Sequence, residues 1–362
     1  MAGKVRIGVA GGGFGTAFFW HEHPDCVVQA VADLRAEPRE ALAKRYRCAT
    51  TYTSLDEMLK DRNVDAVALF TGAPNHARHA VQALKAGKHV LVDAPACWTL
   101  DEARMLVDAV RQSGLIYMSA ETSYWADFVI SARKFYQDGK FGEVFACDAM
   151  YVPPASALSD DPYHWRYGLP PMRWAAHALS LLVSVTGERL TEVVCHGCVD
   201  KSEQYEENRY GNPFSRQTAM FKTSAAHAFC ARVWMTGAEA GIRADWYGTK
   251  MSFIRAGTEI IRTAGQTEKD SAGFVRKLQR EEKYKQVEWW TSDMLPEPLR
   301  HPTDYRNSLG FITHEFVDAV ARGRRAAPDL YDALAYAVPG IIAHESAMKH
   351  GQMMKIPALD RV

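Results

Sequence analysis

The sequence predicts an α/β protein with a doubly wound parallel sheet in its N-terminal part, followed by an α+β domain with an open, largely antiparallel sheet. Three observations predict this architecture. Over the first 120 residues, short apolar runs alternate with helical patterns, which is the rhythm of right-handed βαβ units. A glycine-rich turn directly follows the first apolar run. Beyond about residue 125, strand-like runs follow one another with short links, which favours antiparallel pairing.

The N-terminal elements follow from hydrophobic period and helix-end signals. Strands are predicted at the β-branched, apolar runs of residues 5–10, 27–33, 64–70, 89–93 and 115–120. Helices are predicted around Phe18 and over residues 35–46, 54–60, 76–86 and 100–113. Gly87 and Gly114 follow two of these helices as C-terminal glycines, while Ser54 and Thr99 are suited to cap the helices that they precede.

The pattern of the remaining chain predicts a second domain. Helices are expected at residues 127–137, 175–185, 305–322 and 330–350, and strands at 143–151, 191–199, 217–223, 227–235, 241–247 and 250–254. A long aromatic and proline-rich segment covers residues 152–174. Residues 259–304 mix charges with turn residues and show little periodicity, so a long surface excursion is expected there. The two domains are therefore predicted at residues 1–123 and 124–362.

Length and charge exclude several classes of protein. A chain of 362 residues is too long for one core. Its 43 Lys and Arg balance 43 Asp and Glu, so we expect no nucleic-acid partner, because such proteins usually carry a basic excess. Apolar runs stay short of the ~18–20 residues of a membrane span, which predicts no membrane partner. The lack of an export signal and the singly placed cysteines predict a cytoplasmic protein.

The turn Gly11-Gly12-Gly13-Phe14-Gly15-Thr16 predicts a dinucleotide site. Gly11 and Gly13 fit the first two glycines of the Rossmann fingerprint, where the backbone needs a positive φ and a close approach to the diphosphate. The third glycine falls at Thr16, and the neighbouring Gly15 can supply the close packing instead. Asp33 ends the second strand 20 residues beyond Gly13, the spacing of a ribose-binding carboxylate that favours NAD over NADP. The adjacent Arg35 weakens that preference, and the alternative is a packing turn with Asp33 as a helix cap.

Two further segments resemble a known family. Thr71-Gly72-Ala73-Pro74-Asn75-His76 follows the strand at 64–70, and residues 86–95 read Ala-Gly-Lys-His-Val-Leu-Val-Asp-Ala-Pro. With the glycine turn, they resemble the Gfo/Idh/MocA family, and His344-Glu345-Ser346-Ala347 and Ile356-Pro357 are also similar to it. The resemblance implies a Rossmann domain over 1–123, a substrate-binding and oligomerisation domain over 124–362, NAD(P) in a cleft and a sugar-like substrate. The cofactor contacts that it implies, with those of the turn, are Gly11, Gly13, Phe14, Gly15, Asp33, Arg35, Thr71, Pro74, Asn75, His76, Asp93, Ala94 and Pro95.

The chain departs from that family at two positions. Family dehydrogenases typically carry Glu-Lys-Pro after the fifth strand, and the lysine contacts the reacting hydroxyl, whereas this chain has Asp93-Ala94-Pro95. They also often carry an Asp four residues before a His, whereas here Arg173 precedes His177. The resemblance therefore implies a catalytic constellation reduced to His177.

A second resemblance lies in residues 169–179. An aromatic residue, Trp174, stands three residues before His177, which is similar to the Tyr-Pro-Thr-His segment of NAD-dependent glycoside hydrolases of this fold, including α-N-acetylgalactosaminidases. In those enzymes the cofactor takes a hydride from the sugar and returns it after elimination and water addition. The resemblance implies a redox-neutral glycosidase as an alternative.

Several side chains can carry the chemistry. Oxidation of a secondary alcohol needs a base within reach of the hydroxyl, and histidine suits this role because its ordinary pKa lies near ~6.5. The resemblance therefore implies His177 as the base, with a core histidine as the alternative. Tyr124, just past the sixth predicted strand, lies near where the family places residues that line the nicotinamide pocket, and it is the second catalytic candidate. Aromatic and basic residues that could stack on a sugar or bind its hydroxyls are Tyr163, His164, Trp165, Arg166, Arg173 and Trp174. Packing is the alternative role for each of them.

Cys195-His196-Gly197-Cys198 does not predict a metal site, because zinc needs two further ligands at suitable spacing and the sequence offers none. We expect NAD as the cofactor and hydride transfer at a ring carbon of a carbohydrate or polyol. The redox-neutral glycosidase and a catalytically idle NAD-binding protein remain alternatives. An open sheet with one apolar face, in a chain of zero formal charge, predicts a homodimer or homotetramer.

Overall fold

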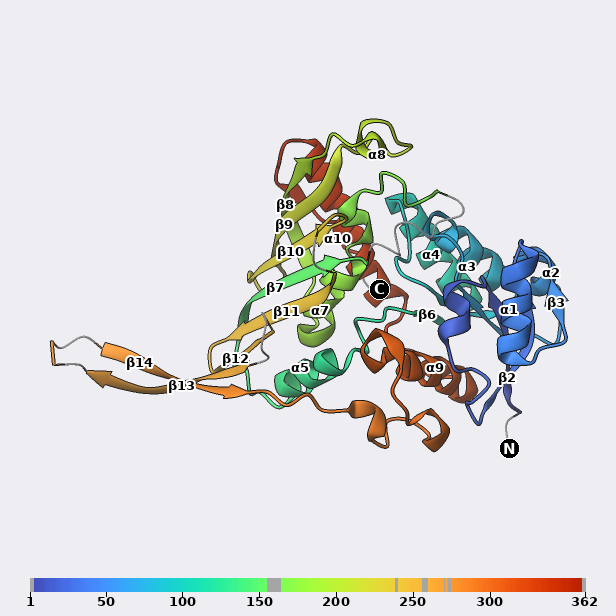
Figure 1. Cartoon of the computed structure of the whole chain (residues 1–362), viewed down its shortest axis with the longest axis horizontal. Helices are drawn as coiled ribbons and strands as arrows, with labels where there is room; N and C mark the ends of the chain where they lie inside the picture. Colours follow the sequence, from blue (N-terminus) through green and yellow to red (C-terminus); the bar gives the residue numbers. More distant parts are fainter. Residues whose placement is uncertain are drawn as a thin grey trace. The chain divides into compact units, whose positions relative to one another are not determined.

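The computed structural model describes residues 3–154, 164–237, 240–255, 260–269, 271–272 and 275–359. The chain forms two compact units (Figure 1). Unit 1 comprises Met1–Asp127, Glu288–Ile341 and Leu359–Val362, and unit 2 comprises Phe128–Val287 and Ile342–Ala358. In the described part of the chain, no helix is long and apolar enough to cross a lipid bilayer.

The sheet of unit 1 has six parallel strands in the order β3-β2-β1-β4-β5-β6. Its strands are β1 (Val5–Ala10), β2 (Cys26–Ala32), β3 (Thr51–Tyr52), β4 (Ala66–Leu69), β5 (His89–Val92) and β6 (Tyr117–Ser119). The predicted strands are confirmed within two residues at each end, and β3 was not predicted. The strand order reverses at β1, which lies between β2 and β4. In such sheets ligands bind at the carboxyl ends of the strands beside this switch point.

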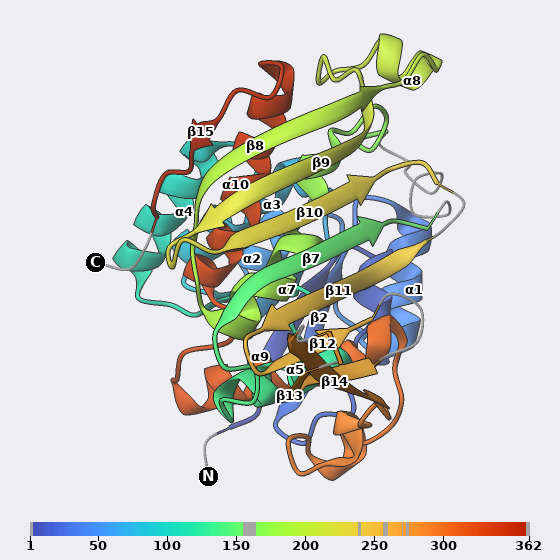
Figure 2. The same ribbon diagram turned by 90° about the vertical axis from the view of Figure 1, so that its left-hand side faces the viewer.

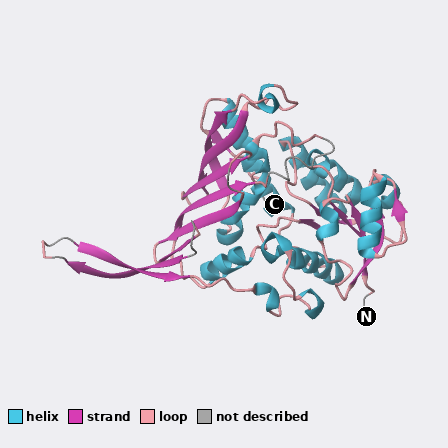
Figure 3. Ribbon diagram, in the orientation of Figure 1, coloured by secondary structure: helices cyan, strands magenta, loops and turns pink. Residues whose placement is uncertain are grey.

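Helix-end chemistry agrees with the sequence in this unit. The helices that alternate with the strands are α1 (Ala36–Tyr46), α2 (Leu55–Leu59), α3 (His76–Lys85) and α4 (Leu100–Ser113) (Figure 3). The Ser54 side chain caps α2, and Thr99 and Glu102 form a reciprocal capping box at α4. Gly114 ends α4 in the left-handed conformation at φ 63°.

The predicted helix around Phe18 is wrong. A short 3-10 helix, η1 (Phe14–Ala17), follows the glycine turn and ends before Phe18, which is extended. The Phe18 ring is fully buried and stacks on Phe70 at 4.5 Å and on Trp20 at 5.5 Å. Burial of these rings in the core fixes this segment in an extended form.

Residues 288–341 belong to unit 1, whereas the sequence pattern predicts them in the second domain. It holds η4 (Trp289–Thr291), η5 (Glu297–Leu299), α9 (Asp304–Arg322) and most of α10 (Leu330–Met348). Rings of α9 pack on the N-terminal part, with Phe316 at 6.2 Å from Trp20 and Phe311 stacked on Trp125 at 5.6 Å. These contacts join residues far apart in the sequence, so no local pattern predicts them.

Unit 2 contains a nine-stranded sheet in the order β14-β13-β12-β11-β7-β10-β9-β8-β15 (Figure 2). Its strands are β7 (Val144–Val152), β8 (Leu190–Val199), β9 (Phe214–Thr223), β10 (Ala228–Trp234), β11 (Gly241–Gly248), β12 (Met251–Ile254), β13 (Ile260–Lys269), β14 (Val275–Lys283) and β15 (Met354–Lys355). Only the β7–β10 pair is parallel among the pairs described. The predicted open, largely antiparallel sheet is confirmed.

Helices cover one face of this sheet. These helices include α5 (Asp127–Gln137) and α7 (Ala176–Thr186). Unit 2 also contains two shorter helical elements, η3 (Pro171–Trp174) and α8 (Glu203–Glu206). The Trp246 indole of β11 donates to the Leu181 carbonyl of α7 at 3.1 Å, and Phe253 of β12 lies 5.7 Å from Phe135 of α5. Side chains of β9 alternate between buried and exposed, so the opposite face of this strand is open.

Residues 259–304, expected to be a long surface excursion, contain two regular strands in the part of this segment that is described. Strands β13 and β14 form an antiparallel hairpin that extends the sheet from β12 and runs out from its edge (Figure 1). Charged residues are spread throughout the segment. The two strands form through backbone pairing of β13 with β12 and with β14, and hydrophobic alternation gives no sign of this pairing.

Candidate active site

The glycine turn after β1 leaves room for a diphosphate. Gly11 has φ +101°, and a Cβ on it would collide with the Phe70 carbonyl oxygen, so this position requires glycine. A Cβ at Gly13 would meet no atom within 4 Å. Gly13 therefore keeps open the space in which the Rossmann fold binds a dinucleotide diphosphate, and the turn fits this group.

Gly15 provides the close packing that the fingerprint assigns to its third glycine. An added Cβ would lie 3.0 Å from the Phe70 ring and 3.2 Å from Val9. Thr16, at the third fingerprint position, donates its hydroxyl to the Gly13 carbonyl at 2.9 Å. Phe14 contacts the Phe18 and Phe70 rings edge-on at 5.1 and 5.5 Å. Packing of Gly15 and Phe14 against neighbouring side chains, together with the hydrogen bond from Thr16 to the Gly13 carbonyl, therefore fixes the turn.

The Asp33 carboxylate lies beside this turn at the end of β2. Its Oδ2 accepts the Gly12 amide at 2.7 Å and its Oδ1 accepts the Arg35 amide at 2.9 Å. Each carboxylate oxygen retains a second lone-pair direction, so the group can still accept hydrogen bonds from ribose hydroxyls. The N-cap residue of α1 is Arg35, which has no side-chain capping bond, so Asp33 is not the N-cap of α1.

A hydrogen-bond chain orients the Thr71 hydroxyl after β4. The Arg78 guanidinium donates to Nε2 of His79 at 2.9 Å and also to the side-chain oxygen of Asn75 at 3.0 Å. Nδ1 of His79 then carries the hydrogen and donates to Thr71 Oγ1 at 2.9 Å. Burial, followed by the charge of Arg78, lowers the pKa of His79 to about 4. The neutral ring leaves the Thr71 hydroxyl hydrogen for a ligand.

The turns after β4 and β5 are joined by His76. This side chain is 1% exposed, and its ring nitrogens lie 2.7 Å from the Thr71 carbonyl and 2.8 Å from the Pro95 carbonyl. Pro74 lies in the 3-10 helix η2 (Ala73–Asn75) between these points. Four of the predicted cofactor contacts, Thr71, Asn75, His76 and Pro95, therefore lie together at the carboxyl edge of the sheet.

The Asp-Ala-Pro segment lacks a titratable group at its centre. The Asp93 carboxylate accepts the amide of Ala94 at 2.8 Å, and Ala94 is 7% exposed. Tyr124, after β6, is half-buried with its ring 5.0 Å from Trp125. Glu121 nearby is fully buried and accepts the Ser123 amide at 2.9 Å.

Sequence reasoning missed Tyr305, which packs against the glycine turn. Its ring lies 5.1 Å from Phe14. Tyr305, Arg306 and Asn307 have φ of 53°, 58° and 65°, a run of left-handed residues that costs roughly 1–2 kcal/mol each. Asn307 supports it by donating to Asp127 at 2.6 Å and accepting the Thr303 amide at 2.9 Å. The sequence pattern predicts these three residues to be the first turn of a helix, so no local signal indicates their left-handed backbone.

Unit 2 contains a cluster of aromatic rings around His177. The His177 ring at the start of α7 lies 4.7 Å from Tyr151 of β7 and 6.5 Å from Trp174 of η3. Trp174 also contacts Trp165 at 6.0 Å. The Arg166 guanidinium lies over both indoles, at 4.2 Å from Trp165 and 5.4 Å from Trp174. Four residues predicted for catalysis or substrate binding are therefore in one cluster.

The indoles of Trp165 and Trp174 are buried, whereas Arg166 and His177 are half-buried. Burial favours packing as the role of the two tryptophans, which hold the polar groups in place. His164 lies outside the cluster and lines a separate cavity of about 420 Å³. Tyr163 lies outside the described residues.

Gln217, which sequence reasoning also missed, fixes the segment before His177. Its side-chain oxygen accepts the Met172 amide at 2.9 Å and its nitrogen donates to Nδ1 of His344 at 3.2 Å. Burial, followed by the charge of Arg173, lowers the pKa of His344 to about 4. A polar residue in the middle of β9 gave no sign of this role, because its partners come from distant parts of the chain.

Cys195 and Cys198 lie in β8, one buried and the other exposed. No group of three or more His, Cys, Asp or Glu side chains that could hold a metal occurs among the residues for which positions are described.

Comparison with known proteins agrees with this geometry. Residues 5–121 match the model of an oxidoreductase family, Gfo/Idh/MocA, with an NAD-binding Rossmann fold. This match lies in the N-terminal part and covers about a third of the 362 residues, so that part of the chain is similar to NAD-binding Rossmann domains. Levoglucosan dehydrogenase in complex with NADH superposes with a TM-score of 0.79 at 19% identity, covering 98% of this chain and 100% of that one.

Curated relatives match over part of their length. Levoglucosan dehydrogenase of Pseudarthrobacter phenanthrenivorans is 26% identical over 45% of this chain and 45% of its own. A dTDP-3,4-didehydro-2,6-dideoxy-alpha-D-glucose 3-reductase of Streptomyces violaceoruber is 28% identical over 60% and 64%. Glycosyl hydrolase family 109 protein 1 of Bacteroides thetaiotaomicron is 28% identical over 44% and 37%. The chain thus spans less than two thirds of the length of these relatives.

Proposed function

We propose that the protein is an NAD-dependent oxidoreductase that transfers a hydride at a ring carbon of a carbohydrate or polyol. The observation that carries the proposal is the cluster in which His177 and Arg166 are held by Tyr151, Trp165 and Trp174. It combines a proton carrier with a hydroxyl-binding cation. The relatives named for levoglucosan and for a dideoxy sugar nucleotide support the substrate class.

The roles of the chain's own groups follow from their chemistry. NAD, when bound, supplies the hydride acceptor for alcohol oxidation. The turn at Gly11–Gly13 and the Asp33 carboxylate hold the diphosphate and the adenosine ribose. His177 accepts the proton of the substrate hydroxyl as its carbon is oxidised, because Ala94 offers no titratable group where family dehydrogenases typically carry lysine. Arg166 and Arg173 donate hydrogen bonds to substrate hydroxyls or to an anionic substituent.

A redox-neutral glycosidase is the second candidate function. The position of Trp174 three residues before His177, together with the match to a glycosyl hydrolase family 109 protein, favours it. The same proton transfer by His177 would then begin a cycle through a transient keto-sugar. A catalytically idle NAD-binding protein is the third possibility, since the family lysine is absent.

One screen separates the three functions. The protein with NAD is incubated with free sugars, polyols and aryl glycosides, and both NADH absorbance and released aglycone are followed. NADH formed from a free sugar or polyol supports the oxidoreductase. Aglycone released without net NADH supports the glycosidase. NAD binding without turnover of any compound contradicts both enzymatic proposals.

A further inference from the structure

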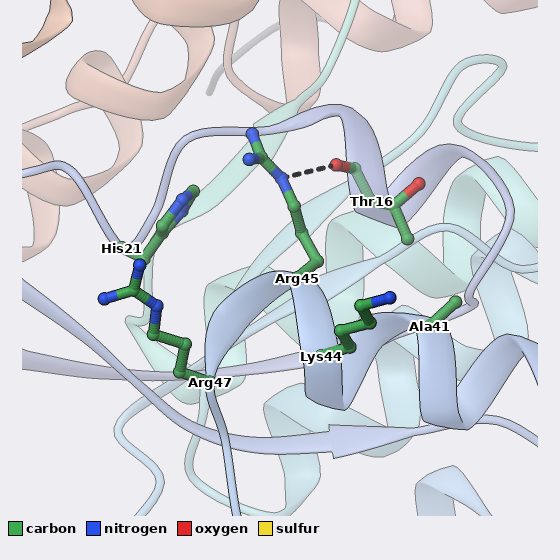
Figure 4. A pocket seen from close by; sticks show the side chains of 6 residues that line it. All are labelled: Thr16, His21, Ala41, Lys44, Arg45 and Arg47. Carbon is green, nitrogen blue, oxygen red and sulfur yellow. Dashed lines mark hydrogen bonds between the residues drawn. The ribbon is translucent and has the colours of Figure 1, made fainter.

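A basic cavity of about 520 Å³ lies in unit 1, between η1 and α1. Its lining residues are Thr16, His21, Ala41, Lys44, Arg45 and Arg47 (Figure 4). Three of the six are permanent cations and none is acidic. Because the whole chain has a formal charge of zero, this concentration of positive charge is local.

The Arg45 guanidinium is fixed without the use of a carboxylate. It donates to the carbonyls of Thr16 at 3.1 Å and Phe18 at 3.4 Å. It also lies over the Phe19 ring at 5.3 Å. Neutral carbonyls and an aromatic ring orient the group but leave its full charge uncompensated.

Lys44 and Arg47 add two further cations at the C-terminal end of α1. Neither side chain forms a hydrogen bond or an ion pair with any part of the chain whose placement is described. Arg47 caps the helix at φ 50°, in the left-handed region where glycine is the usual residue. The helix therefore ends on an arginine at a position whose backbone favours glycine, and that side chain lines the cavity.

Burial, followed by the positive charge of Arg45, lowers the pKa of His21, which also lines the cavity. Glu22 opposes this shift, and the positive charge of Arg47 lowers the pKa further. The other groups against the ring are the Glu22 carboxylate at 3.5 Å and the Tyr46 ring at 5.4 Å. The single nearby carboxylate does not neutralise the three cations.

We propose that this cavity, which shares Thr16 with the glycine turn and is otherwise lined by His21 and by residues of α1 and its end, binds a small phosphate-bearing anion in addition to NAD. Several cations around one space suit a multiply charged oxyanion, and arginine in particular matches phosphate geometry. The volume lies within the ~300–1,000 Å³ of small-molecule sites, so the cavity has room for a diphosphate or for a phosphate monoester with its organic part.

Calorimetry with inorganic pyrophosphate tests the proposal. NAD is present at saturation so that the glycine turn is filled, and sodium chloride keeps the ionic strength constant. We expect binding to the wild type and about tenfold or greater weakening in Lys44→Met and in Arg47→Gly, because each loses a charge-assisted contact. Arg47→Gly suits the left-handed backbone, so it removes the cation while keeping the fold. Lys85→Met, at an exposed lysine near the end of α3, is the matched control and should bind as the wild type does.

A second measurement reports on the cavity itself. The pKa of His21, followed by NMR, should rise when pyrophosphate is added to the wild type and should not rise in Arg47→Gly. Repeating the calorimetry with glucose 6-phosphate separates inorganic from organic phosphates, and tighter binding of either supports the site. Wild-type protein that binds neither probe at millimolar concentration, or equal weakening in Lys85→Met, overturns the proposal.

Discussion

We expect the choice between NAD and NADP to depend on the Asp33 carboxylate. Asp33→Ala removes an acceptor for the ribose hydroxyls and also a negative charge that repels a 2′-phosphate. We expect NAD binding to weaken by roughly 1.5–3 kcal/mol, with NADP binding changed much less. Calorimetry with both nucleotides measures the difference, and Asp108→Ala, at an exposed position of α4, provides the control. Equal NAD affinity in wild type and Asp33→Ala would show that this carboxylate does not hold the ribose.

The hydrogen bond between His79 and the Thr71 hydroxyl provides a second test with single residues. If the His79 ring orients the Thr71 hydroxyl toward the cofactor, His79→Ala and Thr71→Val should each weaken NAD binding by about tenfold, the effect of losing one hydrogen bond. Since both changes remove the same oriented donor, the double variant should weaken binding no more than either single variant. Additive losses in this double-mutant cycle would contradict the hydrogen-bond chain.

The contact between His23, in the loop before β2, and His314 of α9 is expected to be sensitive to pH. His23 is 3% exposed, with its Nε2 3.0 Å from Nδ1 of His314. Burial, followed by the proximity of His314, lowers the pKa of His23 to about 4 from an ordinary value of 6.5. Asp25, Asp318 and Lys4 are the charged groups that act on the same ring.

This shift predicts loss of stability in acid. Because the unfolded chain takes up a proton near pH 6.5 and the folded chain only near pH 4, the free energy of unfolding falls as the pH drops through this window, by at most ~3 kcal/mol for this group. Urea titrations between pH 7 and pH 4 measure it. The free energy of unfolding of His23→Gln should fall less steeply. The remaining fall comes from other histidines with lowered pKa values, such as the half-buried His79 and the buried His344. Parallel curves for the two proteins would contradict the assignment.

Elements with strong local signals could be predicted from the sequence. The strands and helices of the N-terminal part follow from hydrophobic period, and Thr99 and Gly114 mark the two ends of α4. The β13–β14 hairpin and the packing of residues 288–341 on unit 1 could not be predicted, because backbone pairing and long-range ring contacts determine them.

The same difference applies to the candidate site. The glycine turn and Asp33 are adjacent to elements with clear patterns, so spacing alone predicts them. Tyr305 lies in a left-handed run inside an apparent helix, and Gln217 acts through partners from distant segments. Neither residue has a signal in its own neighbourhood of the sequence.

Self-association is the property of the whole molecule that the open sheet predicts. Met220 of β9 is 64% exposed, on the same open face as Arg216, Thr218 and Lys222. An exposed apolar side chain on an open sheet face can pack against a second copy. We expect light scattering to give a homodimer or homotetramer, and Met220→Lys to shift it toward the monomer. Met105→Lys, at a methionine of α4 that is 48% exposed, is the matched control. A wild-type monomer at micromolar concentration would contradict this prediction.

Catalysis by the whole molecule depends, in this account, on proton transfer by His177. The direct measurement is steady-state turnover of His177→Ala on the best compound from the substrate screen, together with calorimetry of NAD. The exposed His196, changed to Ala, is the control. We expect turnover to fall by about 10²–10⁴-fold, the usual effect of removing a general base, with NAD affinity near that of the wild type. Full activity in His177→Ala would contradict the assignment and move the role to Tyr124, Tyr163 or His164.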